Sequence, residues 1–187
     1  MTESPAVVLV VDDEPDVADS YAAFMRDRYE VRTAYSGEAA LDSLEGVDVV
    51  LLDRRMPDMF GDEVLAAIRD RGVDCRVAMV TAVDPDVEII DMEFDDYVVK
   101  PVTREEVLDT VERLLRVAQY ERTLREYYRV TRKCVTLSDA GTGGDIESDP
   151  EFSTLTERRD QLRERLESTA EGFADDDFET LFGDFGT

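Results

Sequence analysis

Four short apolar runs in the N-terminal part of the chain each end in a polar residue that suits phosphate chemistry. The runs, with the polar residues that follow them, are Val7–Val11 with Asp12 and Asp13, Val49–Leu52 with Asp53, Val77–Val80 with Thr81, and Tyr97–Val99 with Lys100. Runs that are apolar throughout are typical of strands covered on both faces, as in a parallel sheet. Because ligands bind outside the carboxyl ends of such strands, we expect these polar residues to share one site.

Helical patterns alternate with the apolar runs. Pro15 stands where proline is tolerated at the start of a first helix. Ser36 caps a second helix that should end near Gly46, and Gly61 leads into a third. Strands are expected at 7–11, 30–34, 48–52, 76–81 and 96–99. The alternation predicts an α/β fold built on a doubly wound parallel sheet.

The last helix of this alternating pattern is expected to be long, and the one before it short. The segment between Thr81 and Lys100 leaves room for only about two helical turns. A capping box of Thr103 and Glu106 then begins a helix. We find no stop signal in its pattern until the glycine-rich stretch 138–144.

A second helical segment is expected after a glycine-rich linker at about 138–150. A capping box of Thr154 and Glu157 predicts a helix from about 154 to 170. Its apolar side is a narrow seam of Leu155, Leu162 and Leu166. An acidic tail with interspersed apolar residues follows to the end of the chain.

The polar residues at the strand ends suit phosphoryl transfer, which needs a nucleophile, a divalent cation and groups that hold the phosphate oxygens. Asp53 is the best candidate nucleophile, because carboxylates form covalent aspartyl phosphates. Asp13 and Asp53 can bind Mg²⁺ directly and Asp12 through water, since this ion prefers a few carboxylates plus water. Lys100 offers a compact positive charge and Thr81 a hydroxyl donor to phosphate oxygens.

This set of motifs resembles the receiver domain of two-component response regulators. The stretches that carry the resemblance are Val11–Pro15, Leu52–Pro57, Gly61, Val80–Ala82 and Tyr97–Pro101, and the similarity covers roughly residues 5 to 117. It implies a receiver domain at 1–117 with a flavodoxin-like five-stranded sheet of order 2-1-3-4-5. It also implies phosphorylation by a sensor histidine kinase with Mg²⁺ as cofactor.

The same resemblance implies a role for each site residue. Asp53 would be the phospho-acceptor, and Asp13, Asp53 and the main-chain carbonyl of Arg55 the metal ligands, with Asp12 acting through water. Thr81 and Tyr97 would form the switch pair, and Lys100 would contact the phosphate. The protein would be a regulatory phospho-acceptor that acts only on itself, not an enzyme. A phosphatase would need an acid two residues after the nucleophile, where this chain has Arg55.

Residues 118–187 resemble the HalX module, a helical region that follows receivers in halophilic archaea. One hypothesis is that phosphorylation switches protein–protein association of these helices, through a homodimer or a downstream protein target. The alternative is a transcriptional regulator whose C-terminal module binds DNA. We find no helix-turn-helix pattern there, although Arg122, Arg125, Arg129, Arg132 and Lys133 make one basic face.

The amino-acid composition indicates in which environment the protein works and which partners are unsuitable. The 46 acidic residues outnumber the 21 basic ones and give a net charge of -25. Such a chain is a poor match for nucleic-acid phosphates, which reward clustered positive charge. The self-repulsion of so many carboxylates is relieved by salt, which favours a halophilic, cytoplasmic protein. We expect no signal peptide and no membrane span, and Cys75 and Cys134 should be free thiols.

Overall fold

The computed structural model of the protein describes residues 5–85, 87–139, 146 and 149–172. The chain divides into two compact units, Met1–Ala118 and Gln119–Thr187.

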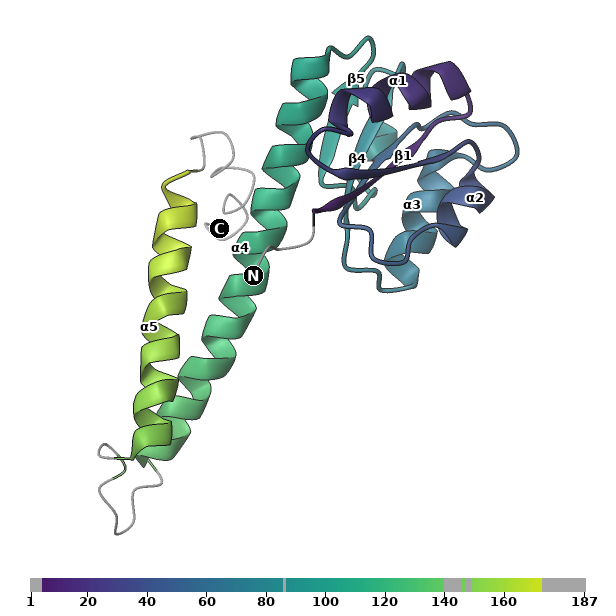
Figure 1. Cartoon of the computed structure of the whole chain (residues 1–187). Helices are drawn as coiled ribbons and strands as arrows, with labels where there is room; N and C mark the ends of the chain where they lie inside the picture. Colours follow the sequence, from purple (N-terminus) through teal and green to yellow (C-terminus); the bar gives the residue numbers. More distant parts are fainter. Residues whose placement is uncertain (1–4, 86, 140–145, 147–148, 173–187) are drawn as a thin grey trace. The chain divides into compact units, whose positions relative to one another are not determined.

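A five-stranded parallel sheet forms the centre of the first unit (Figure 1). Its strands are β1 (Val7–Val11), β2 (Glu30–Ala34), β3 (Val49–Leu52), β4 (Arg76–Thr81) and β5 (Asp96–Val99). Neighbouring strands pair in the order β2-β1-β3-β4-β5, and every pair is parallel. The fold predicted from the apolar runs is confirmed, with the third strand starting one residue later than expected.

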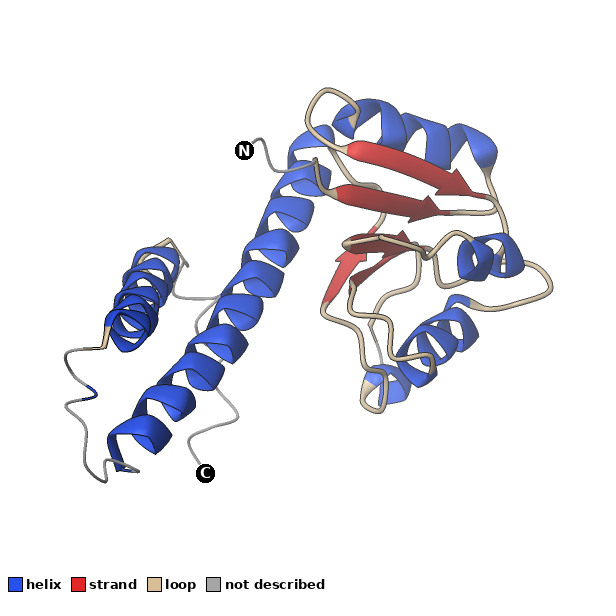
Figure 2. Ribbon diagram, turned by 60° about the horizontal axis from the view of Figure 1, so that its bottom comes forward, coloured by secondary structure: helices blue, strands red, loops and turns tan. Residues whose placement is uncertain are grey.

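Helices cover both faces of the sheet (Figure 2). On one face, α1 (Pro15–Met25) and the first part of α4 (Arg104–Asp139) pack on the even-numbered residues of β1, Val8 and Val10. On the other face, α2 (Gly37–Asp42) and α3 (Gly61–Asp70) pack on Leu9 and Val11. Because both faces are covered, the central strands β1 and β3 are apolar throughout, whereas the edge strand β2 carries Glu30 and Arg32.

The helix boundaries follow from local hydrogen bonds. Pro15 is the first residue of α1, and the Ser36 hydroxyl caps α2 by accepting a hydrogen bond from the Ala39 amide at 3.2 Å. The prediction that the second helix reaches Gly46 is wrong, because α2 ends at Asp42. There the Ser43 hydroxyl donates back to the Ala39 carbonyl at 2.8 Å. Gly46 instead has a positive φ of 71° and turns the chain towards β3.

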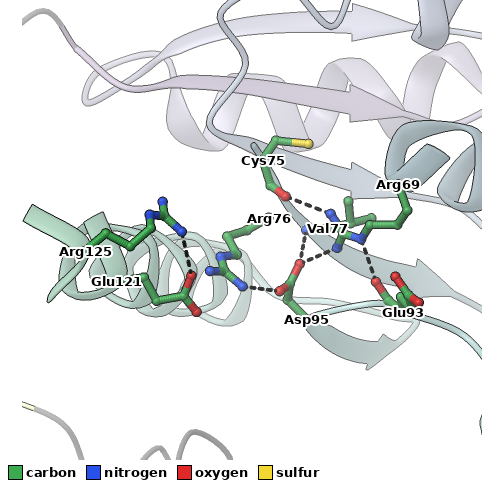
Figure 3. Close-up of polar contacts among 8 residues, drawn as sticks. All are labelled: Arg69, Cys75, Arg76, Val77, Glu93, Asp95, Glu121 and Arg125. Atoms are coloured by element: carbon green, nitrogen blue, oxygen red, sulfur yellow. Dashed lines mark hydrogen bonds and ion pairs between the residues drawn. The ribbon is translucent and has the colours of Figure 1, made fainter. Parts of the chain in front are cut away.

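Among its described residues, the connection between β4 and β5 contains a single 3₁₀ turn, Val87–Ile89. Asp95, which precedes β5, fastens this connection to the amino end of β4 (Figure 3). Its carboxylate accepts hydrogen bonds from Arg69 at 2.7 Å, from Arg76 at 2.6 Å and from the Val77 amide at 2.7 Å. The helix of about two turns predicted here is thus a single 3₁₀ turn, and the Asp95 carboxylate holds the residue before β5 against β4 and α3.

The long α4 begins with the predicted capping box. The Glu106 carboxylate accepts hydrogen bonds from the amide and the hydroxyl of Thr103, both at 2.7 Å. The helix runs to Asp139, where the glycine-rich stretch was expected to stop it. Most of that stretch lies outside the described residues.

The second unit contains the last part of α4 and the helix α5 (Pro150–Ala170). The predicted start of α5 at Thr154 is wrong by four residues, because Asp149 is the true cap. The Asp149 carboxylate accepts from the Glu151 amide at 2.7 Å and Pro150 takes the first helical position, while the Thr154 hydroxyl bonds back to Pro150 inside the helix. No described helix is long and apolar enough to cross a membrane.

Candidate functional site

The carboxyl edge of the sheet brings Asp12, Asp53 and Lys100 together. The Lys100 ammonium nitrogen lies 2.6 Å from Oδ2 of Asp12 and 3.1 Å from Oδ1 of Asp53. All three residues follow a strand directly, so their backbones extend the sheet. The Asp53 amide donates to the Val11 carbonyl at 2.9 Å, and the Lys100 amide to the Thr81 carbonyl at 2.8 Å. The Lys100–Pro101 peptide bond is cis.

Close backbone packing fixes the loop that follows Asp53. The Gly61 amide donates to the Arg54 carbonyl at 2.8 Å. A Cβ atom at Gly61 would lie 2.3 Å from the carbonyl oxygen of Asp53, which no side chain can tolerate. The Arg55 amide donates to Oδ2 of Asp53 at 3.0 Å and orients that carboxylate. Glycine at this position therefore allows the loop to close on the site.

Burial and charge act against each other in the site. The Asp53 side chain is 8% exposed. Burial is the largest influence on this carboxyl and raises its pKa, against the opposing effect of the Lys100 charge. For Lys100, burial lowers the pKa, but its bonds to Asp12 and Asp53 outweigh burial and raise it overall. The lysine therefore stays charged, and the site needs its charge to keep two buried carboxylates close together.

Thr81 and Tyr97 both contact Val83, the second residue after β4. Thr81 is 1% exposed, and its hydroxyl accepts a hydrogen bond from the Val83 amide at 3.4 Å. The Tyr97 hydroxyl donates to the Val83 carbonyl at 2.8 Å. The two residues expected to form a switch pair are thus connected through one backbone segment.

The oxygen donors present fit a hard divalent cation. Each Asp53 carboxylate oxygen accepts one hydrogen bond and keeps a further lone pair, and the half-buried Asp13 stands beside Asp12. Both Asp12 oxygens are already used, one by Lys100 and one by the Glu14 amide at 3.0 Å, which suits an indirect role. No cluster of three or more potential side-chain ligands occurs among the described residues. The predicted set of Asp13, Asp53 and the Arg55 carbonyl contains only two side-chain ligands, which is fewer than such a cluster.

Comparison with known proteins identifies the fold and the arrangement of modules. Residues 8–112 match the response regulator receiver domain, and residues 116–182 match the HalX domain. The chain belongs to the response regulator receiver family. This family is regulatory rather than catalytic, binds Mg²⁺ and works with a cognate histidine kinase.

Three similar proteins illustrate the range of this response regulator's relatives. A protein of Haloferax volcanii that carries the name of a transcriptional regulator is 49% identical over 164 residues, which are 87% of this chain but 27% of that protein. A CheY-like receiver domain of Methanospirillum hungatei has a TM-score of 0.59 and 26% identity, over 63% of this chain and 99% of that one. TrrA of Thermotoga maritima, solved with Mg²⁺ and BeF, has a TM-score of 0.52 and 32% identity, over 59% of this chain and 99% of that one.

Sequence reasoning missed one residue of the receiver site, Arg54. Its side chain is 8% exposed, and its Nε lies 3.1 and 3.2 Å from the two carboxylate oxygens of Asp62. The sequence offers no clear signal for this burial, because an arginine in a loop is usually exposed. The only hint is the acidic residue eight positions later, in the first turn of α3.

Proposed function

We propose that this response regulator accepts a phosphoryl group on Asp53 from a sensor histidine kinase, in a reaction that depends on Mg²⁺. The observation that carries the proposal is the position of Lys100 between Asp12 and Asp53. A carboxylate nucleophile of this kind becomes an aspartyl phosphate. The negatively charged phosphate oxygens then need a nearby positive charge, and Lys100 is placed to supply it. The family resemblance of residues 8–112 supports this proposal.

The chemistry follows from the residues present. An Asp53 carboxylate oxygen attacks the phosphorus atom, and the bond from phosphorus to the donor nitrogen of the kinase breaks. Bound Mg²⁺ would be held by Asp13, Asp53 and the Arg55 carbonyl, and would neutralise charge on the phosphate oxygens. Lys100 would exchange its contact with Asp53 for a contact with a phosphoryl oxygen. The Thr81 hydroxyl, which accepts from the Val83 amide, would donate its own hydrogen to another phosphoryl oxygen.

We propose that the output is a change in how residues 118–170 associate, with a second copy or with a target protein. The helix α4 begins at Arg104, close in sequence to Lys100, and continues to Asp139. In its second part Tyr128 is 63% exposed and Val135 is 51% exposed. Exposed apolar side chains on a helix are typical anchors for a partner helix. A coupling of about 1–3 kcal/mol would suffice to switch such an association.

A small phosphodonor with Mg²⁺ tests the assignment. Intact mass should rise by one phosphoryl group in the wild type and stay unchanged in Asp53→Asn. The matched control is Asp58→Asn in the same loop, an exposed position with a positive φ of 72° that asparagine tolerates. Equal modification of Asp53→Asn and wild type would refute Asp53 as the acceptor. Light scattering of both states in high salt then tests the change in association.

A further inference from the structure

The second part of α4 has two sides of different character. Tyr127, Val130 and Cys134 lie on the side that packs against Leu162 of α5. The opposite side carries exposed residues spaced three and four apart, which places them on one face of the helix. This outer face of α4 consists of Arg125, Tyr128, Arg129, Arg132 and Val135. Tyr128 is 63% exposed and Val135 is 51% exposed, so large apolar surface lies open beside the arginines.

The outer face of α4 suits a partner that is both acidic and aromatic. Arginine pairs with carboxylates and stacks on aromatic rings. Exposed apolar side chains that are framed by charge are typical of an interaction site. A second copy of the same face is a poor partner, because it would bring arginines against arginines. The complementary charge must therefore come from another segment or another molecule.

The C-terminal tail of this chain has the composition that the outer face of α4 requires. Residues 173–187 lie outside the part of the chain that the structure describes. Their sequence contains no basic residue and interleaves carboxylates with phenylalanines. The acidic residues are Asp175, Asp176, Asp177, Glu179 and Asp184, and the aromatic residues are Phe173, Phe178, Phe182 and Phe185. Acidic and apolar residues mixed in this way are typical of interaction segments.

The tail is long enough to reach the outer face of α4. In the second unit, α5 runs back along α4, and the Arg158 guanidinium contacts the Glu126 carboxylate at 2.8 Å (Figure 1). From that contact, Gly172 lies about 21 Å along α5, and Arg132 lies about 9 Å in the opposite direction along α4. This span of about 30 Å is shorter than the roughly 50 Å that residues 173–187 cover when extended. About 20 Å of chain thus remain for passing around the helix.

We propose that residues 173–187 dock on the outer face of α4 within their own chain and cover Tyr128. The tail carboxylates would pair with the arginines, and the tail phenylalanines would pack on Tyr128 and Val135. Salt screens the charges, since the Debye length is about 3 Å at 1 M, but it does not screen apolar contacts, so the phenylalanines should dominate at high salt. The docked tail would also compete with a second copy or a target protein, a consequence that rests on the proposed association.

The first test observes Tyr128 directly, in the full chain labelled with 3-fluorotyrosine at high salt. The ¹⁹F signal missing from Tyr128→Phe identifies Tyr128, and the signal missing from Tyr35→Phe identifies Tyr35 in the first unit. The tail variant, Phe178→Ser combined with Phe182→Ser, should move the Tyr128 signal and leave the Tyr35 signal in place. The control is Phe60→Ser, which removes a phenylalanine that is 58% exposed in the first unit and should leave the Tyr128 signal unchanged.

The second test adds a synthetic peptide of residues 173–187 to the full-length protein at high salt. The tail variant should bind this peptide about tenfold more tightly than the wild type, whose own tail competes as a linked ligand. Adding Tyr128→Ser and Val135→Ser to the tail variant should abolish peptide binding. The matched control adds Val87→Ser and Ile90→Ser, at two apolar positions of the first unit that are 79% and 76% exposed, and should still bind the peptide.

Lowering the salt measures the contribution of charge separately. Adding Arg129→Glu and Arg132→Glu to the tail variant should weaken peptide binding, and by a larger factor at low salt than at high salt, because screening is then weaker. The matched control adds Arg163→Glu and Arg165→Glu, at two exposed arginines of α5, and should bind the peptide as the tail variant does.

Several results would overturn the docking of the tail. Identical Tyr128 signals in the wild type and the tail variant, or equal peptide affinities of the two, would mean that the tail does not cover this face. A wild-type Tyr128 signal that moves to the position of the tail variant on dilution would place the tail on a second copy. A tail variant that binds no peptide but whose Tyr128 signal moves with random-sequence duplex DNA would assign the face to nucleic acid. None of these measurements uses a phosphodonor, so they stand or fall independently of phosphorylation at Asp53.

Discussion

The two units of the chain differ sharply in how much apolar surface they bury. The sheet unit has a packed cluster on each face, and Val8, Leu9, Val10 and Val11 of β1 are each at most 1% exposed. In the described part of the helical unit, one small cluster contains Val130, Cys134 and Leu162 as its buried members. A pair of helices with so small a core gains little from packing, since most helical stability in proteins comes from tertiary contacts.

This difference in packing matches the two proposed activities of the protein, phosphorylation and association. The proposed phosphorylation chemistry needs groups held at fixed distances, and it lies on the well-packed sheet. The proposed association lies on helices with exposed apolar side chains and a small core, whose contacts a modest change in free energy can rearrange. If the two units differ in this way, substitutions in the sheet core should destabilise the protein more than substitutions in the helical unit.

Leu52→Ala should have the largest effect on stability. Leu52 is fully buried in β3, and removing its side chain should lower the free energy of unfolding by about 2–5 kcal/mol. Urea unfolding followed by circular dichroism measures this change. Leu137→Ala, at a position 38% exposed, is the control and should change the value by less than about 0.5 kcal/mol. Similar effects at the two positions would mean that the sheet core is not the main source of stability.

Leu162→Ala should act mainly within the helical unit. Leu162 is 1% exposed and packs in the cluster with Val130 and Cys134. Hydrogen exchange should become faster throughout α5 and the second part of α4. The free energy of local unfolding there should fall by an amount at the lower end of the range of about 2–5 kcal/mol. Exchange in β1 and β3 should not change. Equal acceleration in the strands would show that the two units unfold together and would remove the contrast between them.

Asp95→Asn should have an intermediate effect, confined to the sheet unit. The substitution removes the charge shared by Arg69 and Arg76, whose side chains are 22% and 18% exposed. We expect a loss of about 1.5–3 kcal/mol in the free energy of unfolding, the usual range for hydrogen bonds to charged groups. Glu30→Gln, which breaks an exposed pair with Arg32, should cost at most about 1 kcal/mol. Equal urea midpoints for these two variants would contradict a structural role for Asp95.

Thr103→Ala should have the smallest effect, about 1 kcal/mol, because it removes one helix cap. The hydrogen bonds from Thr103 lower the pKa of Glu106. A lowered carboxyl pKa contributes stability above the ordinary glutamate pKa, and that contribution is lost as the pH falls through the lowered value. The difference in unfolding free energy between wild type and Thr103→Ala should therefore shrink on acidification. A difference that stays constant down to acidic pH would show that the Thr103 hydroxyl does not stabilise the Glu106 carboxylate.

The sequence predicted the sheet well because its strands are governed by local patterns. Runs such as Val7–Val11 can satisfy both covered faces only as central strands, and Pro15 and Ser36 mark helix starts by their own chemistry. The start of α5 was misplaced because two capping signals compete there, and Asp149 with Pro150 prevails over Thr154. Nothing in the local pattern separates these two signals.

The site was predictable in part for the same reason. Asp53 and Lys100 each follow an apolar run. In the structure, the Lys100 ammonium nitrogen lies 3.1 Å from Oδ1 of Asp53. The burial of Arg54 and the sharing of Asp95 by two arginines depend on which loops meet in space. Such contacts between segments distant in sequence leave no periodic pattern, so they could be found only from the structure.

The strand order has a consequence for aggregation. It leaves β2 and β5 at the edges of the sheet, and an unpaired edge is a template for a strand of another molecule. On β2, the ion pair of Glu30 and Arg32, 3.0 Å apart, puts charge along that edge. On the other side β5 has only four residues, too few to support a long intermolecular ladder. Both edges are therefore poor templates for strand exchange, so copies of this chain could meet through their helices without merging their sheets.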